Sequence, residues 1–509
     1  MATRAGGVGY RVAVAVEPRP TDPQAVLEEV FGYHEFRPGQ REVIEAVLAG
    51  RDCIAVMPTG AGKSLTFQVP AKLLGGTVLV VSPLISLMKD QVDALERLGF
   101  RAAVLNSTLS EPERWERLQQ LQRGELELVY LAPEGLTDWL RQFIGACPIR
   151  LVVVDEAHCI SHWGHDFRPA YRQLYDLKSR LGEVPVLALT ATATRRVAAD
   201  IIRQLGMRKP AGYKGSFFRP NLRILAQKKG QGRAGRGQLL GIIHAHAGET
   251  GIVYANSRKG VDGLTEWLTQ QGVRAVPYHA GLDDRTRARH QEAFARDQVN
   301  VVVATVAFGM GIDKSNVRFV IHRDMPKNVE AWYQEIGRAG RDGLPSDCVV
   351  FYSWSDVINY DAFLRDIADP FQRGTTRERT VALFRLLERG GCRHQALVGY
   401  FDEAIEPCGD ACDSCAGLSV EGIAGPVPAP AQQLDGIVNR GLFERLRALR
   451  RRLADMEGVP AYVVFSDATL REMARQVPRS VLELRGVSGV GPAKLARYGE
   501  AFLEILRGA

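Results

Sequence analysis

Two series of short apolar runs, separated by amphipathic stretches, constrain the fold of this 509-residue sequence more than any other feature. The first series reads CIAVM (53–57), TVLVVSP (77–83), ELVYLAP (127–133), RLVVVDE (150–156) and VPVLALT (184–190). The second reads GIVYAN (251–256), RAVPYHA (274–280), VNVVVAT (299–305), VRFVIHR (317–323) and DCVVFY (347–352). Continuous β-branched runs with helical segments between them are typical of parallel strands buried on both faces. We therefore predict an α/β protein with two tandem parallel-sheet lobes.

The remaining sequence divides around these lobes. We expect a loose N-terminal leader, a first lobe, a second lobe, a helical cysteine-containing module, a linker rich in Pro, Ala and Gly, and a small helical C-terminal domain. The corresponding boundaries are 1–24, 25–207, 208–355, 356–417, 418–436 and 437–509.

Composition narrows the class of protein only moderately. Hydrophobic residues make up 46% of the chain, enough for sizeable cores, and no apolar run has the length of a membrane span. The N-terminus lacks the apolar core of a signal peptide, so we expect a cytoplasmic protein without a membrane partner. The net charge of +7 is compatible with a polyanionic partner.

The segment MPTGAGKS (57–64) reads as a phosphate-binding loop between a strand and a helix. Gly60 and Gly62 let the backbone N–H groups face a di- or triphosphate, and the start of the following helix adds partial positive charge. Lys63 would reach the β- and γ-phosphates of ATP, and Ser64 would hold Mg²⁺. Met57 replaces the first glycine of the usual pattern, and a fortuitous glycine-rich turn is the alternative.

An acidic pair follows the strand RLVVVDE. Asp155 and Glu156 lie at the carboxyl end of the predicted strand, where open α/β sheets place their ligands. Asp155 can hold the hydration shell of Mg²⁺, and Glu156 can orient or deprotonate the attacking water. His158 completes this candidate catalytic group, whose alternative is an ordinary acidic strand end.

Further motifs give the sequence a family resemblance. FRPGQ (36–40), SPLISLMKDQV (82–92), LTATAT (189–194) and YQEIGRAGRDG (333–343) occur in the order and spacing of superfamily 2 helicases. The sequence resembles the RecQ family over nearly its whole length. That resemblance implies two RecA-like lobes that use ATP to move 3′→5′ on single-stranded DNA and to unwind tailed or branched duplexes. It also implies a role in DNA repair and recombination, near the bacterial nucleoid.

The resemblance assigns roles around the nucleotide. Gln40 and Arg37 would contact the base, with Tyr33 stacking on it, and Thr59 would belong to the phosphate loop. In the second lobe Arg341 would act as the arginine finger, making hydrolysis depend on lobe closure. The supporting phosphate and water network would contain Arg338 and Gln334.

The segment CISHWGHDFRP (159–169) resembles the aromatic-rich loop through which this family senses single-stranded DNA. Aromatic faces stack on any base, and arginine follows the phosphates. The predicted contacts are Trp163, His165, Phe167 and Arg168. Alternatively, Trp163 and Phe167, four residues apart, form an ordinary helix-core pair.

Two segments of the second lobe resemble DNA- and nucleotide-binding motifs more weakly. YANSRK (254–259) suggests that Ser257 and Arg258 contact the DNA backbone. TVAFGMGIDK (305–314) places Thr305 near a phosphate and Asp313 near the interlobe cleft, where it would contribute to nucleotide binding.

Four of the eight cysteines crowd into one stretch, which indicates metal binding in an intracellular chain. Cys392, Cys408, Cys412 and Cys415 would close a tetrahedral, structural Zn²⁺ site. Three residues separate Cys408 from Cys412, whereas the family pattern has two. His394 is the alternative to Cys392 as a ligand.

The sequence departs from the RecQ pattern after this cluster. A winged-helix domain, whose hairpin can open a duplex, usually follows the zinc module, but the linker here is too short for one. The C-terminal segment resembles an HRDC domain, which binds nucleic acid or docks on the motor or a protein partner. Besides a helicase, we therefore consider a translocase or branch remodeller that unwinds weakly, and a zinc-stabilised strand-annealing protein.

Overall fold

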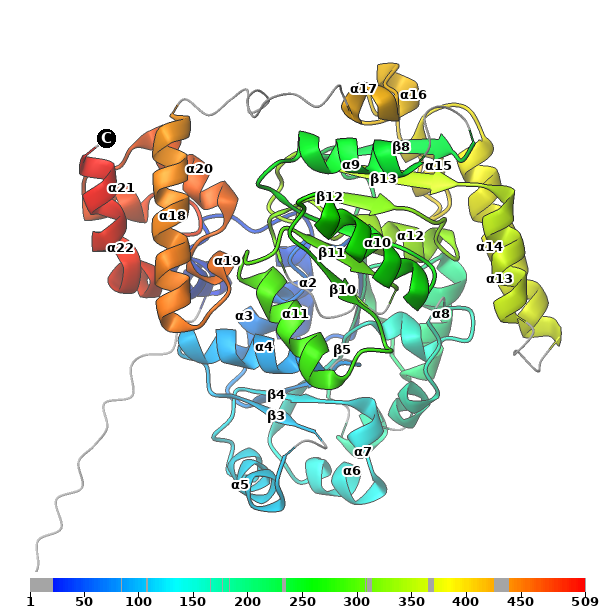
Figure 1. The fold of residues 1–509 in the computed structure, drawn as a ribbon. Coiled ribbons are helices and arrows are strands. Elements are labelled where there is room, and N and C mark those ends of the chain that lie inside the picture. The colour runs from blue at the N-terminus through cyan, green and yellow to red at the C-terminus, as the bar shows by residue number, and fades with distance from the viewer. Residues whose placement is uncertain are drawn as a thin grey trace, which may run out of the picture.

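The structure is a computed structural model of the whole chain (Figure 1). Its first 21 residues and several short internal stretches are not described. The described residues are 22–83, 85–106, 109–164, 166–175, 177–182, 184–230, 235–306, 308, 314–364, 370–424 and 439–508.

The first lobe contains a seven-stranded sheet in the order β3-β4-β2-β5-β6-β1-β7, with every pairing parallel. Its β-branched strands are almost wholly buried because helices cover both faces. The strands are β1 (Cys53–Val56), β2 (Thr77–Val81), β3 (Ala102–Leu105), β4 (Leu128–Leu131), β5 (Ile149–Val154), β6 (Val186–Thr190) and β7 (Ala211–Lys214). The main helices are α2 (Gln40–Leu48), α3 (Leu65–Leu73), α4 (Ile85–Arg97), α5 (Glu111–Gln122), α6 (Asp138–Gly145) and α8 (Arg195–Gln204).

The second lobe contains a six-stranded parallel sheet in the order β10-β11-β9-β12-β13-β8. Its strands are β8 (Leu222–Lys228), β9 (Thr250–Tyr254), β10 (Ala275–Tyr278), β11 (Val301–Ala304), β12 (Val317–His322) and β13 (Ser346–Tyr352). Its helices are α9 (Gly235–Ala245), α10 (Arg258–Gln270), α11 (Asp284–Ala295) and α12 (Val329–Ile336). Two RecA-like lobes are thus confirmed.

A helical module follows the second lobe and covers the open edge of its sheet at β8. The Ile224 N–H donates to the Ala411 carbonyl at 3.0 Å, and the Ala226 N–H donates to the Asp413 carboxylate at 3.0 Å. His394 also bonds the Leu222 carbonyl. The helices are α13 (Trp354–Phe363), α14 (Pro370–Glu388), α15 (Arg393–Gly399), α16 (Asp413–Ala416) and α17 (Val420–Ala424).

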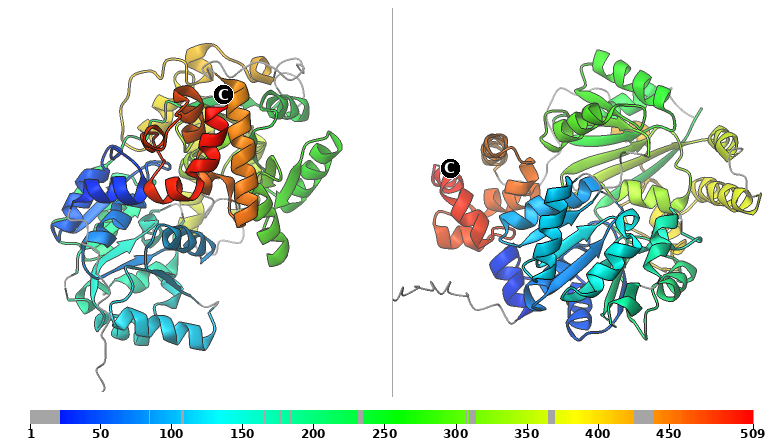
Figure 2. Two further views of the ribbon diagram at one scale, coloured as in Figure 1. Left: turned by 90° about the vertical axis from the view of Figure 1, so that its left-hand side faces the viewer. Right: turned by 90° about the horizontal axis from the view of Figure 1, so that it is seen from below.

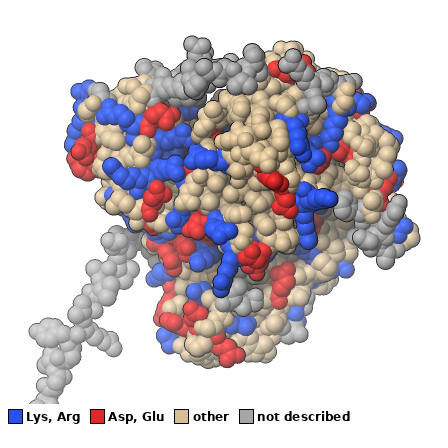
Figure 3. Space-filling model, in the orientation of Figure 1, with Lys and Arg blue, Asp and Glu red and all other residues tan. Residues whose placement is uncertain are grey.

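The C-terminal domain is a small helical bundle with a core of its own. It lies beside the motor, at the left in Figure 1, and the views of Figure 2 place it against both lobes. Lys and Arg side chains gather over it and where it meets the second lobe (Figure 3). Its helices are α18 (Arg440–Glu457), α19 (Ala461–Val464), α20 (Asp467–Gln476), α21 (Val481–Arg485) and α22 (Pro492–Arg507).

Hydrogen bonds to backbone carbonyls hold this domain to both lobes. On the first lobe, the Gly489 N–H donates to the Gly32 carbonyl at 3.2 Å. On the second lobe, Arg447 donates to the Gly248 carbonyl and Arg296 donates to the Gly458 carbonyl, each at 3.1 Å. The predicted alternative of a bundle that docks on the motor is therefore what the structure shows.

Three predicted boundaries need correction. The first lobe does not end at residue 207, because β7 pairs with β1 in its sheet. The linker does not begin at residue 418, because α17 places Val420 against α9 in the core of the second lobe. The leader does not reach residue 24, because α1 (Pro23–Val26) begins at Pro23 and is capped by the Asp22 side chain. Residues 1–21 of the leader and 425–438 of the linker lie outside the described part of the chain.

No helix within the described ranges is long and apolar enough to cross a membrane.

Candidate nucleotide, DNA and metal sites

The phosphate loop connects β1 to α3, as predicted. Gly60 and Gly62 adopt φ values of 83° and 76°, in the left-handed region that glycine enters without strain. The Lys63 ammonium donates to the Met57 carbonyl at 3.2 Å, across the base of the loop. Ser64 precedes the first turn of α3, so its hydroxyl lies where a phosphate-bound cation is usually held.

The segment before α2 supports this loop from outside. The buried Gln40 amide donates to the Ala61 and Gly62 carbonyls at 3.1 and 2.9 Å, and its oxygen accepts the Arg37 backbone N–H at 2.8 Å. The Arg37 guanidinium donates to the Gly60 carbonyl. Tyr33 is 41% exposed. Their contact with a base stays a prediction.

The acidic pair lies beyond the end of β5, where the backbone turns sharply. Glu156 has a φ of 47°, a left-handed conformation that is rare for a non-glycine residue and is often found at functional sites. Burial and the neighbouring Glu156 carboxylate raise the pKa of Asp155 to about 6. Lys63 lowers the pKa of both carboxyl groups. A crowded, buried carboxylate pair of this kind fits a bound divalent cation, which would stabilise its charged form.

His158 links the acidic pair to the LTATAT segment. Its Nδ1 lies 3.3 Å from the Glu156 carboxylate and 3.0 Å from the Thr190 hydroxyl. Burial disfavours the imidazolium, but contacts with Cys159 and Glu156 outweigh it and raise the pKa of His158 to about 10. The Thr190 hydroxyl in turn donates to the Thr192 carbonyl at 3.0 Å. A polar chain thus leads from the acidic pair toward the second lobe.

The second lobe closes directly onto the phosphate loop. The Gln334 amide donates to the Thr192 hydroxyl at 3.4 Å, which brings α12 to the end of the polar chain. A Cβ built on Gly337 would lie 2.0 Å from the Thr59 hydroxyl, so only glycine fits there. One built on Gly60 would lie 3.6 Å from Arg341 Cα. Arg338 is buried and lowers the pKa of Glu156 across the same cleft.

Sequence reasoning missed Arg219, which lies between the lobes. Its guanidinium donates to the Thr59 carbonyl at 2.9 Å and to the Ala339 and Gly340 carbonyls at 3.1 and 2.6 Å. The segment SFFRPN (216–221) has neither the strand periodicity nor the glycine pattern of a nucleotide motif. Only a basic residue at the crossing from one sheet to the next marked this position.

The aromatic-rich loop lies between short 3-10 helices at Ala157–Ile160 and Pro169–Leu174, and its described residues between them are not helical. Trp163 and Phe167 therefore do not share a helix, and the helix-core alternative is wrong. Trp163 packs partly against the main core, with the Arg196 guanidinium 3.1 Å from its ring centre. It lines a small hollow together with Thr192 and Glu330, beside the polar chain. The ring centres of Phe167 and His162 are 3.9 Å apart. Arg168 pairs with Asp166 at 3.2 Å, and His165 lies outside the described residues.

The weaker DNA candidates of the second lobe lie at the carboxyl ends of two adjacent strands. Ser257 and Arg258 follow β9, and Thr305 follows the adjacent strand β11. The Ser257 hydroxyl caps α10 by accepting the Gly260 N–H at 3.0 Å, while the Arg258 side chain is exposed. Asp313 lies outside the described residues. The structure brings the first three together, and their DNA contacts stay predictions.

The four cysteines form one cluster, in which all the sulfur atoms lie within 4.8 Å of one another. Backbone N–H groups point at two of them, from Gln395 and Cys408 to Cys392 and from Cys415 to Cys412. Burial raises the pKa of Cys392, but the N–H groups outweigh it and lower that pKa to about 7. Thiolates held by N–H donors fit Zn²⁺.

His394 is not part of this cluster. Its Nε2 lies 2.9 Å from the Leu222 carbonyl and 3.1 Å from the Ala411 carbonyl, so it anchors the module to β8. The alternative in which it replaces Cys392 is therefore wrong.

Profiles of four protein families match the chain in succession. They are DEAD/DEAH box helicase over residues 37–201, helicase conserved C-terminal domain over 235–343, RecQ zinc-binding over 354–416 and HRDC domain over 439–506. The zinc-binding and HRDC matches are separated only by residues 417–438, which is too short for another stable domain.

Solved structures of helicases share the fold. The DUF1998 helicase MrfA bound to DNA matches 68% of this chain and 52% of its own, with a TM-score of 0.55 and 17% identity. Dbp5 of S. cerevisiae, bound to RNA and ADP BeF3, matches 68% of this chain and 94% of its own, with a TM-score of 0.52 and 15% identity.

Curated relatives are much closer in sequence. The ATP-dependent DNA helicase RecQ of Haemophilus influenzae is 37% identical over 593 residues, covering 95% of each chain. That of Bacillus subtilis is 36% identical over 583 residues, covering 94% of this chain and 98% of its own. Both alignments exceed 509 residues, so both relatives carry segments without a counterpart here. With its nucleotide cleft, its cysteine cluster and this agreement over nearly the whole length, the chain belongs to the RecQ family of ATP-dependent DNA helicases.

Proposed function

We propose that this helicase couples ATP hydrolysis to 3′→5′ movement along single-stranded DNA, and that it separates tailed or branched duplexes in DNA repair and recombination. The observation that carries the proposal is the closed cleft, in which Gly337 and Arg341 of the second lobe and Arg219 between the lobes reach the phosphate loop. Closure that depends on nucleotide, followed by reopening, moves two lobes alternately along a strand.

In this cleft Lys63 and the phosphate-loop N–H groups hold the triphosphate, and Arg341 and Arg338 face it from the second lobe. Mg²⁺, when bound by Asp155 and Ser64, neutralises phosphate charge. Glu156 orients the attacking water, and His158 keeps the Glu156 carboxylate ionised. Gln334 connects this group to the closing lobe.

The same geometry supports a route from DNA to the nucleotide. Trp163 shares its hollow with Thr192, whose hydroxyl accepts the Gln334 amide. A base stacked on the aromatic loop would therefore act next to the polar chain that joins the lobes. Arg168, His165 and Phe167 would hold the strand on the first lobe. Ser257, Arg258 and Thr305 would hold it on the second.

The decisive experiment compares ATP-dependent strand separation on 3′-tailed and 5′-tailed duplexes, beside DNA-stimulated ATPase. The proposal expects unwinding of the 3′-tailed substrate and ATPase stimulated by single-stranded DNA. Unwinding of the 5′-tailed duplex alone would show that the protein moves 5′→3′, contrary to the proposal. ATPase stimulated by RNA and not by DNA would show that its substrate is RNA.

A second candidate is a translocase or branch remodeller that separates plain duplexes poorly. The short spacing between the zinc-binding and HRDC regions favours it, because no winged helix fits there. Vigorous DNA-stimulated ATPase without strand separation, together with movement of branched junctions, is the result that would select it.

A further inference from the structure

Arg219 lies in the interlobe segment, residues 215–221, which connects β7 of the first sheet to β8 of the second. It belongs to neither lobe, yet the three backbone carbonyls that it bonds come from the nucleotide loops of both. Its Nε also donates to Asn221 Oδ1 at 3.3 Å. Thr59 is part of the phosphate loop, whereas Ala339 and Gly340 lie between Arg338 and Arg341. One planar guanidinium thus spans the interlobe cleft beside the two arginines expected to face the phosphates.

The charge around Arg219 is unbalanced. Burial lowers its pKa; Tyr333 and Cys348 oppose this, and the nearby cations Arg341 and Arg37 add to it. Within the described part of the chain, no carboxylate forms an ion pair with its guanidinium. Its Nη1 would lie 3.4 Å from a Cβ on Gly60, so this positive group is next to the phosphate loop. Among the described residues, its hydrogen-bond acceptors are neutral carbonyl oxygens, and an anion in the loop would stabilise the whole cluster.

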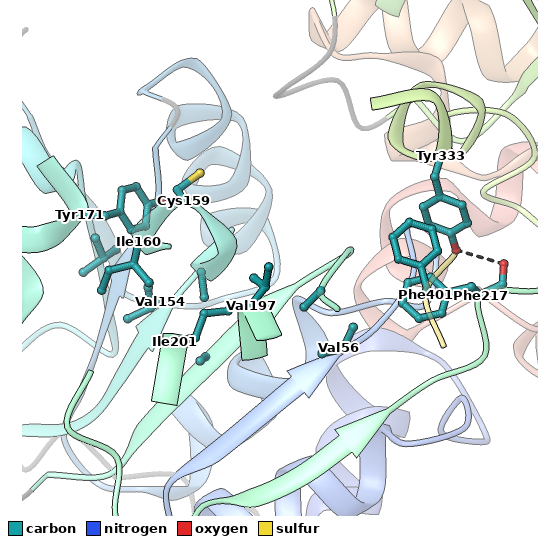
Figure 4. Close-up of a cluster of buried hydrophobic side chains, with 14 of the residues drawn as sticks. Val56, Val154, Cys159, Ile160, Tyr171, Val197, Ile201, Phe217, Tyr333 and Phe401 are labelled. Atoms are coloured by element: carbon teal, nitrogen blue, oxygen red, sulfur yellow. Dashed lines mark hydrogen bonds between the residues drawn. The ribbon is translucent and has the colours of Figure 1, made fainter. Parts of the chain in front are cut away.

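The backbone that presents Arg219 is fixed on both sides. The Phe217 N–H donates to the Glu403 carboxylate of the cysteine module at 2.7 Å. The rings of Phe217 and Phe401 stack with centres 4.4 Å apart, and the Tyr333 hydroxyl donates to the Phe217 carbonyl at 3.2 Å (Figure 4). After Arg219, the Asn221 amide donates to the Gly340 and Leu344 carbonyls at 2.9 and 3.0 Å. The interlobe segment is therefore a rigid support for the Arg219 side chain.

We propose that Arg219 is a positioning residue that aligns the Arg338–Arg341 loop with the phosphate loop when the lobes close. The inference rests on ATP hydrolysis in this cleft. Arg219 carries out no chemistry itself; it sets the distance between the two loops. Interactions needed only in the closed, reacting state affect kcat rather than KM.

The test is steady-state DNA-stimulated ATPase of Arg219→Ala and Arg219→Lys in the full-length protein. We expect Arg219→Ala to lower kcat about 100-fold, as for a misplacement on the order of 1 Å, while KM for ATP stays nearly unchanged. Arg219→Lys keeps the charge, but a compact ammonium does not span both loops, so it should restore little of the loss. Millimolar guanidinium should partly rescue Arg219→Ala.

A second measurement does not depend on turnover. In the wild type, ADP with beryllium fluoride should slow hydrogen exchange of the backbone amides at 337–344, and Arg219→Ala and Arg219→Lys should both lose this protection. Arg223→Ala is the matched control, because Arg223 pairs with Asp347 at 2.7 Å near the start of β8, away from the cleft. That control should keep wild-type kcat and protection.

Each alternative outcome has a distinct meaning. A raised KM with unchanged kcat would make Arg219 a simple nucleotide-binding cation, and full rescue by Lys would reduce its role to charge; either result overturns the inference. Should Arg219→Ala fail to fold, normal protection and kcat in Arg219→Lys would overturn it equally. A wild-type protein without DNA-stimulated ATPase would refute the proposed function instead.

Discussion

Lys63 combines two roles in one ammonium group. It closes the phosphate loop on the Met57 carbonyl and lowers the pKa of the acidic pair. We expect Lys63→Ala to reduce ATPase at least about 100-fold, because it removes the charge that meets the phosphates. Binding of single-stranded DNA, measured by fluorescence anisotropy, should stay close to wild type. An equal loss of both activities with a lower melting temperature would mean that Lys63 is mainly structural.

Trp163 has a different expected effect, since it lies beside the polar chain rather than in the cleft. Trp163→Ala should weaken the stimulation of ATPase by DNA at least about tenfold, more than it weakens DNA binding, because base stacking is shared among several aromatic groups. Titrating single-stranded DNA into the ATPase assay measures both quantities. Trp115→Ala, at an exposed position on α5, is the control. Unchanged stimulation would remove the sensing role.

We expect His246 to make the free energy of unfolding depend on pH. Burial would lower its pKa, but hydrogen bonds to Asp347 and Glu249, at 3.0 and 2.7 Å, raise it to about 9. A raised folded-state pKa stabilises the protein fully below about 6.5 and no longer above about 9. His246→Gln should therefore cost about 2 kcal/mol at pH 6 and little at pH 9.5. Denaturant unfolding of both proteins at both pH values measures this loss of unfolding free energy. An equal loss at both pH values would mean that the charge of His246 does not contribute.

Much of the candidate site could be predicted because its residues follow strands. Asp155 comes directly after β5, and Lys63 ends the glycine-rich loop that follows β1. The strand pattern and the phosphate-loop motif together therefore predicted that both residues lie at the carboxyl ends of the strands. Arg219 and the Thr190–His158 contact could not be predicted in this way. They join segments far apart in sequence, and only the way the lobes pack brings them together.

Phe401 connects three elements of the molecule. This residue of the cysteine module is fully buried. Its ring contacts Phe217 of the interlobe segment and Tyr333 of α12. We expect Phe401→Ala to cost about 3–5 kcal/mol locally and to lower the melting temperature. DNA-stimulated ATPase should also fall, because α12 carries Gln334. Tyr175→Ala, at a 65% exposed position, should leave both unchanged. Wild-type stability in Phe401→Ala would contradict this account.

Among the strands, the sequence predicted those with continuous apolar runs and missed those with a weaker apolar pattern. β3 (AAVL) has little β-branched character, and β7 (AGYK) is an exposed edge strand with a glycine. β8 (LRILAQK) ends in polar and basic residues, without the continuous apolar run of the predicted strands. The start of α9 could not be predicted either, because the glycines at 235 and 237 resemble a turn.

The C-terminal domain touches both sides of the nucleotide cleft. It bonds Gly32 just before Tyr33, and Arg471 of α20 interacts electrostatically with Asp342, next to Arg341. Lobe opening must therefore strain or release this docking. The sequence alone left docking and DNA binding equally open, because both use a basic amphipathic helix.

Gly491 offers a clean test of the docking. Its φ of −76° suits any residue, but an added Cβ would lie 3.0 Å from the Gly32 backbone nitrogen. Gly491→Val should release the domain from the first lobe without unfolding it. Small-angle scattering should then show a radius of gyration larger by about 1 Å or more, as for a displaced small domain. Gly263→Ala, at an open position of α10, is the control. An unchanged radius in Gly491→Val would mean that other contacts suffice.

The cover over β8 has a consequence for solubility. Unpaired N–H and C=O groups along an outer strand invite a second molecule to add its own strand, and natural proteins blunt such edges. Here Ala411 and Asp413 occupy the N–H groups of Ile224 and Ala226, and both lie beside cysteines of the cluster. Chelating the metal would uncover this strand. The first sign should be aggregation, seen as light scattering that increases with protein concentration. We therefore expect the metal site to protect this edge from pairing with a neighbouring copy.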